Sequence, residues 1–269
     1  MRNWDDALAN MAYVPGSEAL PEIWAGRAAG YCSALPSLRA DIAYGPNSRH
    51  RFDLVLPEGA PKGLVVFVHG GYWMRFDKSF WTDLAEGARA HGWGVALPSY
   101  RLAPEARISE ITRDVGQAIA AAAGLVEGPI RLMGHSAGGH LVSRMICEDS
   151  PLPAQVFDRI ELTLPISGLF DLRPLLRSKM NETFKLTETE AVSESAALRR
   201  PRGEPRVTCW VGDAERPEFV RQSRLFATMW EGVDARIDLV LDPGANHFTV
   251  IEGLKSPDSS IVAALFAGA

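Results

Sequence analysis

Residues 130–141 read Ile-Arg-Leu-Met-Gly-His-Ser-Ala-Gly-Gly-His-Leu, and they are the most informative segment of the chain about its architecture. Residues 130–133 are typical of a short buried strand, and residues 137–147 favour a helix. The pattern Gly-x-Ser-x-Gly lies between them. Its small residues leave room for a sharp strand-to-helix turn that exposes the serine hydroxyl. The sequence therefore predicts that Ser136 is a nucleophile at the edge of a sheet.

A glycine-rich loop before a helix can instead cradle a phosphate. Such a loop requires Gly-Lys-Ser or Gly-Lys-Thr, and Gly138-Gly139-His140 lacks the lysine. The strand before the motif and the helix after it favour the nucleophile.

The surrounding segments alternate between strand and helix patterns. Leu64–Val68 is the continuous apolar run Leu-Val-Val-Phe-Val, which is typical of a strand buried on both faces. Further strands are predicted at 51–56, 94–97, 160–166, 207–211 and 237–241, and further helices at 79–91 and 108–123. This alternation predicts an α/β fold with a mostly parallel central sheet and helices on both faces.

We expect residues 1–269 to form a single domain, because nothing in the chain marks a boundary. Residues 1–40 carry weaker helix patterns, around 5–11 and 21–32, and are predicted to be an N-terminal extension. Residues 171–204 lack a strand pattern and are inserted between two strands. They are predicted to form a small lid or cap near the carboxyl ends of the strands, where such sheets bind ligands.

Composition narrows the classes of partner. The net charge of −5 argues against nucleic acid, whose recognition needs a cationic surface. No run approaches the roughly 20 apolar residues that cross a membrane, and the first residues do not resemble a signal peptide. Three widely spaced cysteines, Cys32, Cys147 and Cys209, predict free thiols. We expect a cytoplasmic protein with a small-molecule substrate, and leave a homodimer open.

The sequence His69-Gly70-Gly71-Tyr72-Trp73 directly follows the apolar run 64–68. Enzymes of acyl transfer need fixed donors for a developing oxyanion, and backbone amides are suited to that role. Glycine allows the backbone to approach a substrate closely. In α/β-hydrolases one donor comes from a loop of this kind and another from the residue after the nucleophile, here Ala137.

The base and the acid should follow the serine in the order serine, acid, histidine. Only His140 and His247 follow Ser136, and His140 lies on the predicted helix itself. His247 lies in a loop after the last predicted strand, which favours it as the base.

The acid is expected in the loop that begins at Gly212. Both Asp213 and Glu215 are available, and either carboxylate could orient an imidazole. We favour Glu215, because many α/β-hydrolases carry the acid three residues after the glycine that ends this strand. Asp213 and, more remotely, Asp171 remain alternatives.

Together these residues resemble the kynurenine formamidase (arylformamidase) branch of the α/β-hydrolases. The likeness extends from about residue 41 to the C-terminus. The motifs that carry it are His69-Gly70-Gly71-Tyr72-Trp73, Gly134-His135-Ser136-Ala137-Gly138-Gly139-His140-Leu141, Ile166-Ser167-Gly168-Leu169-Phe170-Asp171-Leu172, Pro217-Glu218-Phe219 with Gln222-Ser223, and His247-Phe248 before Glu252-Gly253-Leu254.

The resemblance implies an oxyanion hole formed by the amides of Gly71, Tyr72 and Ala137. It also implies hydrolysis of N-formylkynurenine to kynurenine and formate, without a metal or organic cofactor. One departure is that eukaryotic members usually have aspartate before Ser-Pro-Glu-Phe, where this chain has Glu215 before Arg216-Pro217-Glu218-Phe219.

An aromatic wall for an aryl substrate is predicted from Tyr72, Trp73 and Phe76, with Trp81 as a further candidate. Each of these could equally be a core residue. Two other functions compete with arylformamidase: a general short-chain carboxylesterase, and a non-catalytic binding protein on a hydrolase scaffold. The presence of serine, histidine and acid together argues against the binding protein.

Overall fold

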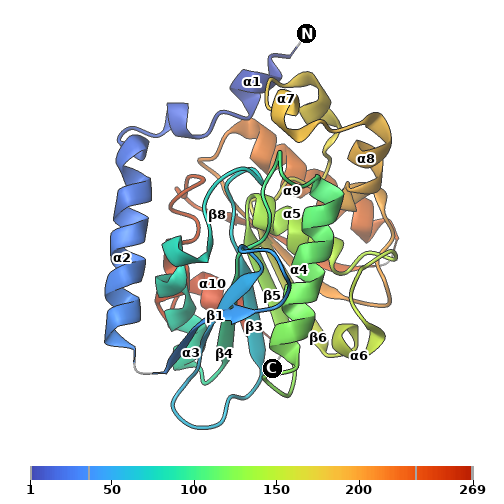
Figure 1. Cartoon of the computed structure of the whole chain (residues 1–269). Coiled ribbons are helices and arrows are strands. Elements are labelled where there is room, and N and C mark those ends of the chain that lie inside the picture. The colour runs from blue at the N-terminus through green and yellow to red at the C-terminus, as the bar shows by residue number, and fades with distance from the viewer. Residues whose placement is uncertain (1, 36, 234, 268–269) are drawn as a thin grey trace.

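In the computed structural model, the described residues 2–35, 37–233 and 235–267 contain one eight-stranded sheet (Figure 1). The strands are Leu38–Ala43 (β1), Arg51–Val55 (β2), Leu64–Val68 (β3), Gly94–Pro98 (β4), Ile130–His135 (β5), Ile160–Ile166 (β6), Arg206–Gly212 (β7) and Arg236–Asp242 (β8). Their order in the sheet is β1-β2-β4-β3-β5-β6-β7-β8. β2 pairs antiparallel with β1 and β4, and the remaining neighbours are parallel. The predicted mostly parallel sheet is confirmed.

The α-helices of the described residues are Trp4–Ala7 (α1), Leu20–Ala34 (α2), Glu86–Ala90 (α3), Ile108–Ala123 (α4), Ala137–Arg144 (α5), Ala154–Phe157 (α6), Asn181–Phe184 (α7), Glu188–Ser193 (α8), Pro217–Glu231 (α9) and Ser260–Leu265 (α10). α4 has the predicted bounds. The prediction of one helix at 79–91 was wrong, because the chain forms two short 3₁₀ turns, Lys78–Phe80 and Thr82–Ala85, before α3. Trp81, with φ of −132°, separates the two turns and prevents a continuous helix.

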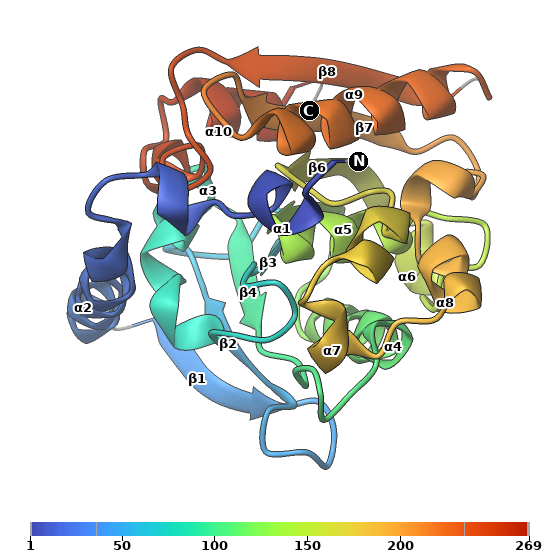
Figure 2. The same cartoon turned by 90° about the horizontal axis from the view of Figure 1, so that it is seen from above.

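The sheet is buried on both faces, which explains the continuous apolar run of β3. Leu64, Val66 and Val68 pack in the core on one face. Val65 and Phe67 pack in a second core on the other face. Each fully buried side chain of this size contributes roughly 1.5–3 kcal/mol through removal of apolar surface from water. Viewed from above, α4, α5 and α9 cover one face, and α2, α3 and α10 lie on the other (Figure 2).

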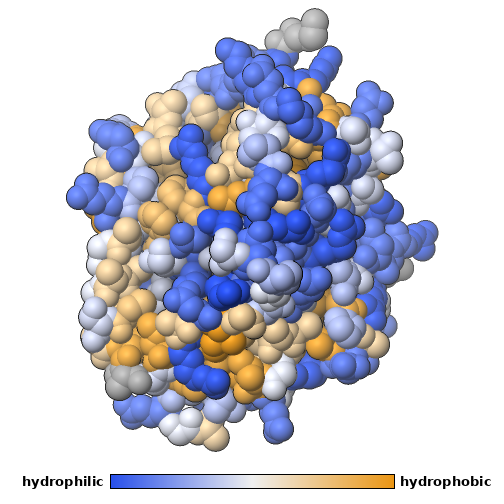
Figure 3. All heavy atoms as spheres, in the orientation of Figure 1, coloured by the Kyte–Doolittle hydropathy of each residue, from blue (hydrophilic) through white to orange (hydrophobic). Residues whose placement is uncertain are grey.

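The edge strand β1 had not been predicted. Its residues, Leu-Arg-Ala-Asp-Ile-Ala, are mostly exposed, so they lack the apolar pattern of the central strands. On the outside of the molecule, hydrophilic residues cover most of the right half of the face in Figure 3, and apolar areas are scattered over its left half and lower part. None of the helices in the described part of the chain has the length and apolar character to cross a membrane.

The loops after β3, β5, β7 and β8 leave the sheet at the carboxyl ends of their strands. Open α/β sheets bind their ligands at this edge. Each loop carries one part of the predicted site, so the topology gathers residues that are far apart in the sequence.

Candidate active site

The turn between β5 and α5 holds Ser136 in a strained conformation. Its φ of 55° and ψ of −117° lie in a region that side chains other than glycine rarely adopt. The amide of Ser136 donates to the Ile166 carbonyl at 2.8 Å, which fixes the turn against β6. The turn needs glycine at 138, because a Cβ there would lie 1.9 Å from the Val68 carbonyl oxygen. The sequence pattern therefore reflects close packing of the turn against β3.

Three of the predicted side chains form a continuous hydrogen-bonded chain. The Oγ of Ser136 lies 3.0 Å from Nε2 of His247, and Nδ1 of His247 lies 2.6 Å from Oε2 of Glu215. All three residues are buried. A carboxylate can only accept, so Nδ1 carries the imidazole proton and Nε2 has a free lone pair. This tautomer allows Nε2 to accept the hydroxyl proton of Ser136.

Glu215 is held on its other side by two donors. Its Oε1 accepts from the Gly212 amide at 3.0 Å and from the Ser167 hydroxyl. Ser167 follows β6 and has φ of 51°, while its amide donates to the Trp210 carbonyl at 2.7 Å. Sequence reasoning missed this role of Ser167. Both oxygens of Glu215 are occupied, so the carboxylate has one fixed orientation.

His135 holds the loop that carries His247. Its Nε2 donates to the His247 carbonyl at 2.8 Å. Burial lowers the pKa of His135 well below its usual value, and the neighbouring His247 lowers it further. His135 is therefore neutral, and its contact is a donor bond from an uncharged ring.

The loop after β3 packs directly against Ser136. A Cβ on Gly70 would lie 3.0 Å from the Cβ of Ser136. Gly71 and Tyr72 have positive φ values of 108° and 52°, and a Cβ on Gly71 would lie 2.5 Å from the Arg75 carbonyl oxygen. Among the described residues, no hydrogen-bond acceptor is found for the amides of Gly71 and Tyr72. The amide of Ala137, in the first turn of α5, has no intrahelical acceptor either. Such amides can bind an oxyanion.

His69 stabilises the start of this loop. Its Nδ1 donates to the Gly70 carbonyl at 2.7 Å, and its ring stacks on Tyr100 with centroids 4.4 Å apart. Burial lowers the pKa of His69 to about 4, so the ring is neutral at pH 7. The Tyr100 hydroxyl donates to the His69 carbonyl at 2.8 Å. These contacts give the loop a rigid base.

A cavity of about 500 Å³ opens above Ser136 and His247. Aromatic rings from four parts of the chain line it: Trp24, Tyr72, Phe76, Trp81 and Phe248. The Trp24 ring lies 4.8 Å from Trp81 and 5.8 Å from Phe248, measured between centroids. Trp24 belongs to α2 and lies in no motif of the sequence, whereas Phe248 lies in the His247-Phe248 motif but had not been predicted to line the substrate site.

Comparisons with known proteins agree with this geometry. Residues 52–155 match the BD-FAE family model. A kynurenine formamidase of Danio rerio is 28% identical over 225 residues, which cover 80% of this chain and 76% of that protein. A crystal structure from a Silicibacter species, of a protein named only provisionally as a thioesterase, is 50% identical with a TM-score of 0.95. The match covers 99% of this chain and all of that one.

The chain is a hydrolase with the α/β-hydrolase fold, and its sequence is similar to those of kynurenine formamidases. The fold prediction is also confirmed by more distant structures. Esterase B from Lactobacillus rhamnosis superposes with a TM-score of 0.71 at 17% identity, covering 95% of this chain and 91% of that one.

In this hydrolase the other candidates for the acid and the base make contacts that do not include the imidazole of His247. Asp213 accepts from the Gly244 amide at 2.7 Å, and Asp171 pairs with Arg173 at 2.8 Å. His140 is buried, and its Nε2 donates to the Glu194 carbonyl at 2.8 Å. Neither aspartate contacts His247 in the described residues.

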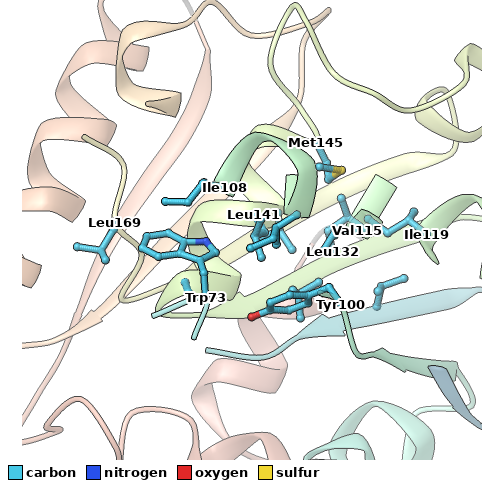
Figure 4. Close-up of a cluster of buried hydrophobic side chains, with 14 of the residues drawn as sticks. Trp73, Tyr100, Ile108, Val115, Ile119, Leu132, Leu141, Met145 and Leu169 are labelled. Atoms are coloured by element: carbon cyan, nitrogen blue, oxygen red, sulfur yellow. The ribbon is translucent and has the colours of Figure 1, made fainter. Parts of the chain in front are cut away.

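The position of Trp73 does not match the substrate-binding role predicted for it. Its side chain is fully buried and does not border the cavity. Figure 4 shows the indole in the core with Ile108, Leu141 and Leu169 around it. The positive φ of Trp73, 55°, turns the chain so that Tyr72 contacts the cavity while Trp73 points into the core. Tyr72 and Phe76 do line the cavity.

The predicted N-terminal extension is part of the cavity wall. Residues 8–12, together with Asp5, line the cavity beside Ser136. The inserted segment 171–204 contains α7 and α8 and contributes Lys179 and Met180 to the same wall. In Figure 2, α1 lies across the strand ends between α7 and α9.

Proposed function

We propose that this hydrolase cleaves aryl formamides through a formyl-enzyme on Ser136, and that its substrate is N-formylkynurenine, which yields kynurenine and formate. The observation that carries the proposal is the hydrogen-bonded chain Glu215–His247–Ser136 at the base of an aromatic cavity. The cavity of about 500 Å³ is of the size that encloses a small aromatic ligand.

In the first half of the reaction, Ser136 Oγ attacks the formyl carbon while His247 Nε2 accepts the hydroxyl proton of Ser136. The amides of Gly71, Tyr72 and Ala137 stabilise the oxyanion. Glu215 stabilises the imidazolium that forms. His247 then donates the proton to the leaving nitrogen, the C–N bond breaks, and the arylamine departs.

In the second half, water attacks the formyl-enzyme and gives its proton to His247 Nε2. Collapse of the second tetrahedral intermediate returns that proton to Ser136 Oγ and releases formate. The cycle consumes one water per amide bond and needs no redox partner.

The aromatic wall supports an aryl leaving group. Trp24, Phe76, Trp81 and Phe248 pack with centroid distances of 4.8–5.8 Å among themselves. Stacked or edge-on rings of this kind favour a planar aromatic ligand over an aliphatic one. The relatives named kynurenine formamidase, in Danio rerio and Drosophila melanogaster, support the same substrate class.

Hydrolysis of an aryl ester or thioester is the second candidate. It is favoured by the relative that is 50% identical over nearly the whole chain and carries the provisional thioesterase name. Esters and thioesters would use the same serine and the same oxyanion donors.

The test compares kcat/KM for N-formylkynurenine, p-nitrophenyl acetate, p-nitrophenyl butyrate and an S-phenyl thioester, with Ser136→Ala as the blank. We expect the formamide to be the best substrate. Turnover of the esters or the thioester with none of the formamide would replace the proposal by the second candidate. No turnover of any of them would contradict both.

A further inference from the structure

The N-terminal segment, defined here as residues 3–13, is held by three separate parts of the chain, of which Tyr72 and Lys179 line the main cavity and Arg216 does not. The Tyr72 hydroxyl donates to the Leu8 carbonyl at 2.5 Å. The Lys179 amide donates to Asp5 at 2.7 Å, and Arg216 donates to the Asp6 carboxylate at 2.8 Å. The segment therefore has a defined position over the site.

Asn10 in this segment has an unusual environment. The residue is 5% exposed, and neither Oδ1 nor Nδ2 has a hydrogen-bond partner among the described residues. Its backbone carbonyl is fixed, because it accepts from the Tyr13 amide at 3.1 Å. A buried carboxamide without partners is costly, so its retention calls for an explanation.

The location of Asn10 gives that explanation. It lines the main cavity together with Ser136 and His247. It also lines a second cavity of about 390 Å³ that borders His247 and Glu215. Asn10 and His247 thus both line the main cavity and the second cavity. In the proposed reaction the leaving nitrogen must lie close to His247, since His247 protonates it.

We propose that Asn10 is a specificity-determining residue that recognises the N–H of a secondary amide substrate. Its Oδ1 accepts from the nitrogen of the scissile formamide, which deepens the proposed function and rests on it. An ester has an oxygen without hydrogen at this position, so it leaves Oδ1 unpaired in a buried site. Sites built to bind a substrate N–H or O–H discriminate strongly against analogues that lack it.

The test uses two substrates that differ only at this atom, formanilide and phenyl formate. The variant Asn10→Leu keeps the approximate volume and removes both polar atoms. Asn3→Leu is the matched control, because Asn3 caps α1 in the same segment without lining either cavity. The readout is the ratio of kcat/KM for formanilide to kcat/KM for phenyl formate.

We expect Asn10→Leu to lower this ratio roughly 10- to 100-fold, as for loss of a hydrogen bond in a buried site. Asn3→Leu should leave the ratio within about threefold of the wild type, because Asn3 lines neither cavity and substitutions away from such sites usually have effects of this size or smaller. The role of Asn10 is overturned if the ratio is unchanged, including the case in which kcat/KM falls by the same factor for formanilide and for phenyl formate.

A second measurement separates this proposal from the proposed function. The affinity of formanilide is measured by calorimetry for Ser136→Ala, with and without Asn10→Leu, so it does not depend on turnover. Binding that weakens tenfold or more with Asn10→Leu supports the recognition of the N–H even if the wild type cleaves only the ester. Unchanged affinity, or no binding to either protein, overturns it. Failure of the proposed function is seen separately, as absence of formamide cleavage by the wild type.

Discussion

Replacement of Glu215 by glutamine tests the orientation of the imidazole. In the wild type, Oε1 of Glu215 accepts from the Gly212 amide at 3.0 Å and from the Ser167 hydroxyl, and Oε2 contacts Nδ1 of His247 at 2.6 Å. Glutamine has the same shape but only one oxygen. The Gly212 amide can only donate, so the glutamine oxygen must face it.

The NH₂ group of the glutamine then faces Nδ1 of His247. Since an NH₂ group donates, Nδ1 must accept, and the imidazole proton moves to Nε2. Nε2 lies 3.0 Å from Ser136 Oγ and can no longer take its proton. The wrong tautomer in such a triad lowers kcat by about 10⁴. This factor corresponds to about 5 kcal/mol in the activation barrier.

The assay is kcat at saturating phenyl formate, with the thermal unfolding midpoint as a check that the variant folds. Asp213→Asn is the control, because Asp213 contacts the Gly244 amide and not His247. We expect the control to retain activity within about threefold, the range of ordinary surface substitutions. Retention of a tenth of the wild-type kcat by Glu215→Gln, or an equal loss of kcat in Asp213→Asn, would show that Glu215 does not orient the imidazole.

Three further predictions follow from the same structure. Ser136→Ala should lower kcat by roughly 10⁴–10⁶ with an unchanged fold; a variant at a tenth of wild-type activity, by the same assay, would contradict the assignment. Trp73→Ala should reduce the free energy of unfolding in urea by about 3–5 kcal/mol, because the indole is fully buried in the core; a loss below about 1 kcal/mol would place that ring outside the core. Burial lowers the pKa of His69 to about 4 and of His140 to about 3, so both are neutral in the folded protein at pH 7. In the unfolded chain the two imidazoles bind protons below about pH 6.5. The free energy of unfolding is therefore highest above that pH, and it falls as the pH drops towards 4, by up to about 1.4 kcal/mol per pH unit for each histidine. Urea midpoints that stay constant between pH 7 and 4.5 would contradict it.

The sequence predicted those parts of the fold that depend on local patterns. β3 and α4 had the predicted bounds, because a continuous apolar run specifies β3 and an alanine-rich stretch that ends at Gly124 specifies α4. The turn at Ser136 was predictable for a similar reason: the close approach of neighbouring backbone restricts position 138 to glycine, and this restriction is visible in the sequence.

What the sequence did not reveal depends on contacts between distant residues. Trp24 reaches the cavity because α2 packs beside Trp81, and Ser167 reaches Glu215 across neighbouring strands. Trp73 was misplaced because its neighbour Tyr72 faces the cavity, and only the backbone angles separate the two directions. Residues 1–40 gave weak patterns, since the position of residues 3–13 depends on partners 64 to 210 residues away.

Because residues 3–13 dock over the site, bond cleavage and substrate binding depend on different parts of the structure. The residues proposed for bond cleavage lie in the loops at the carboxyl ends of the strands. Part of the cavity wall, in contrast, is the segment 3–13, which lies outside the sheet and is held by a few polar contacts. Exchange of this stretch between homologues could retune substrate choice without disturbing the catalytic turn. Two chains with the same serine turn and the same His-Gly-Gly loop can therefore differ in substrate specificity. A function assigned from those two motifs alone would miss that difference.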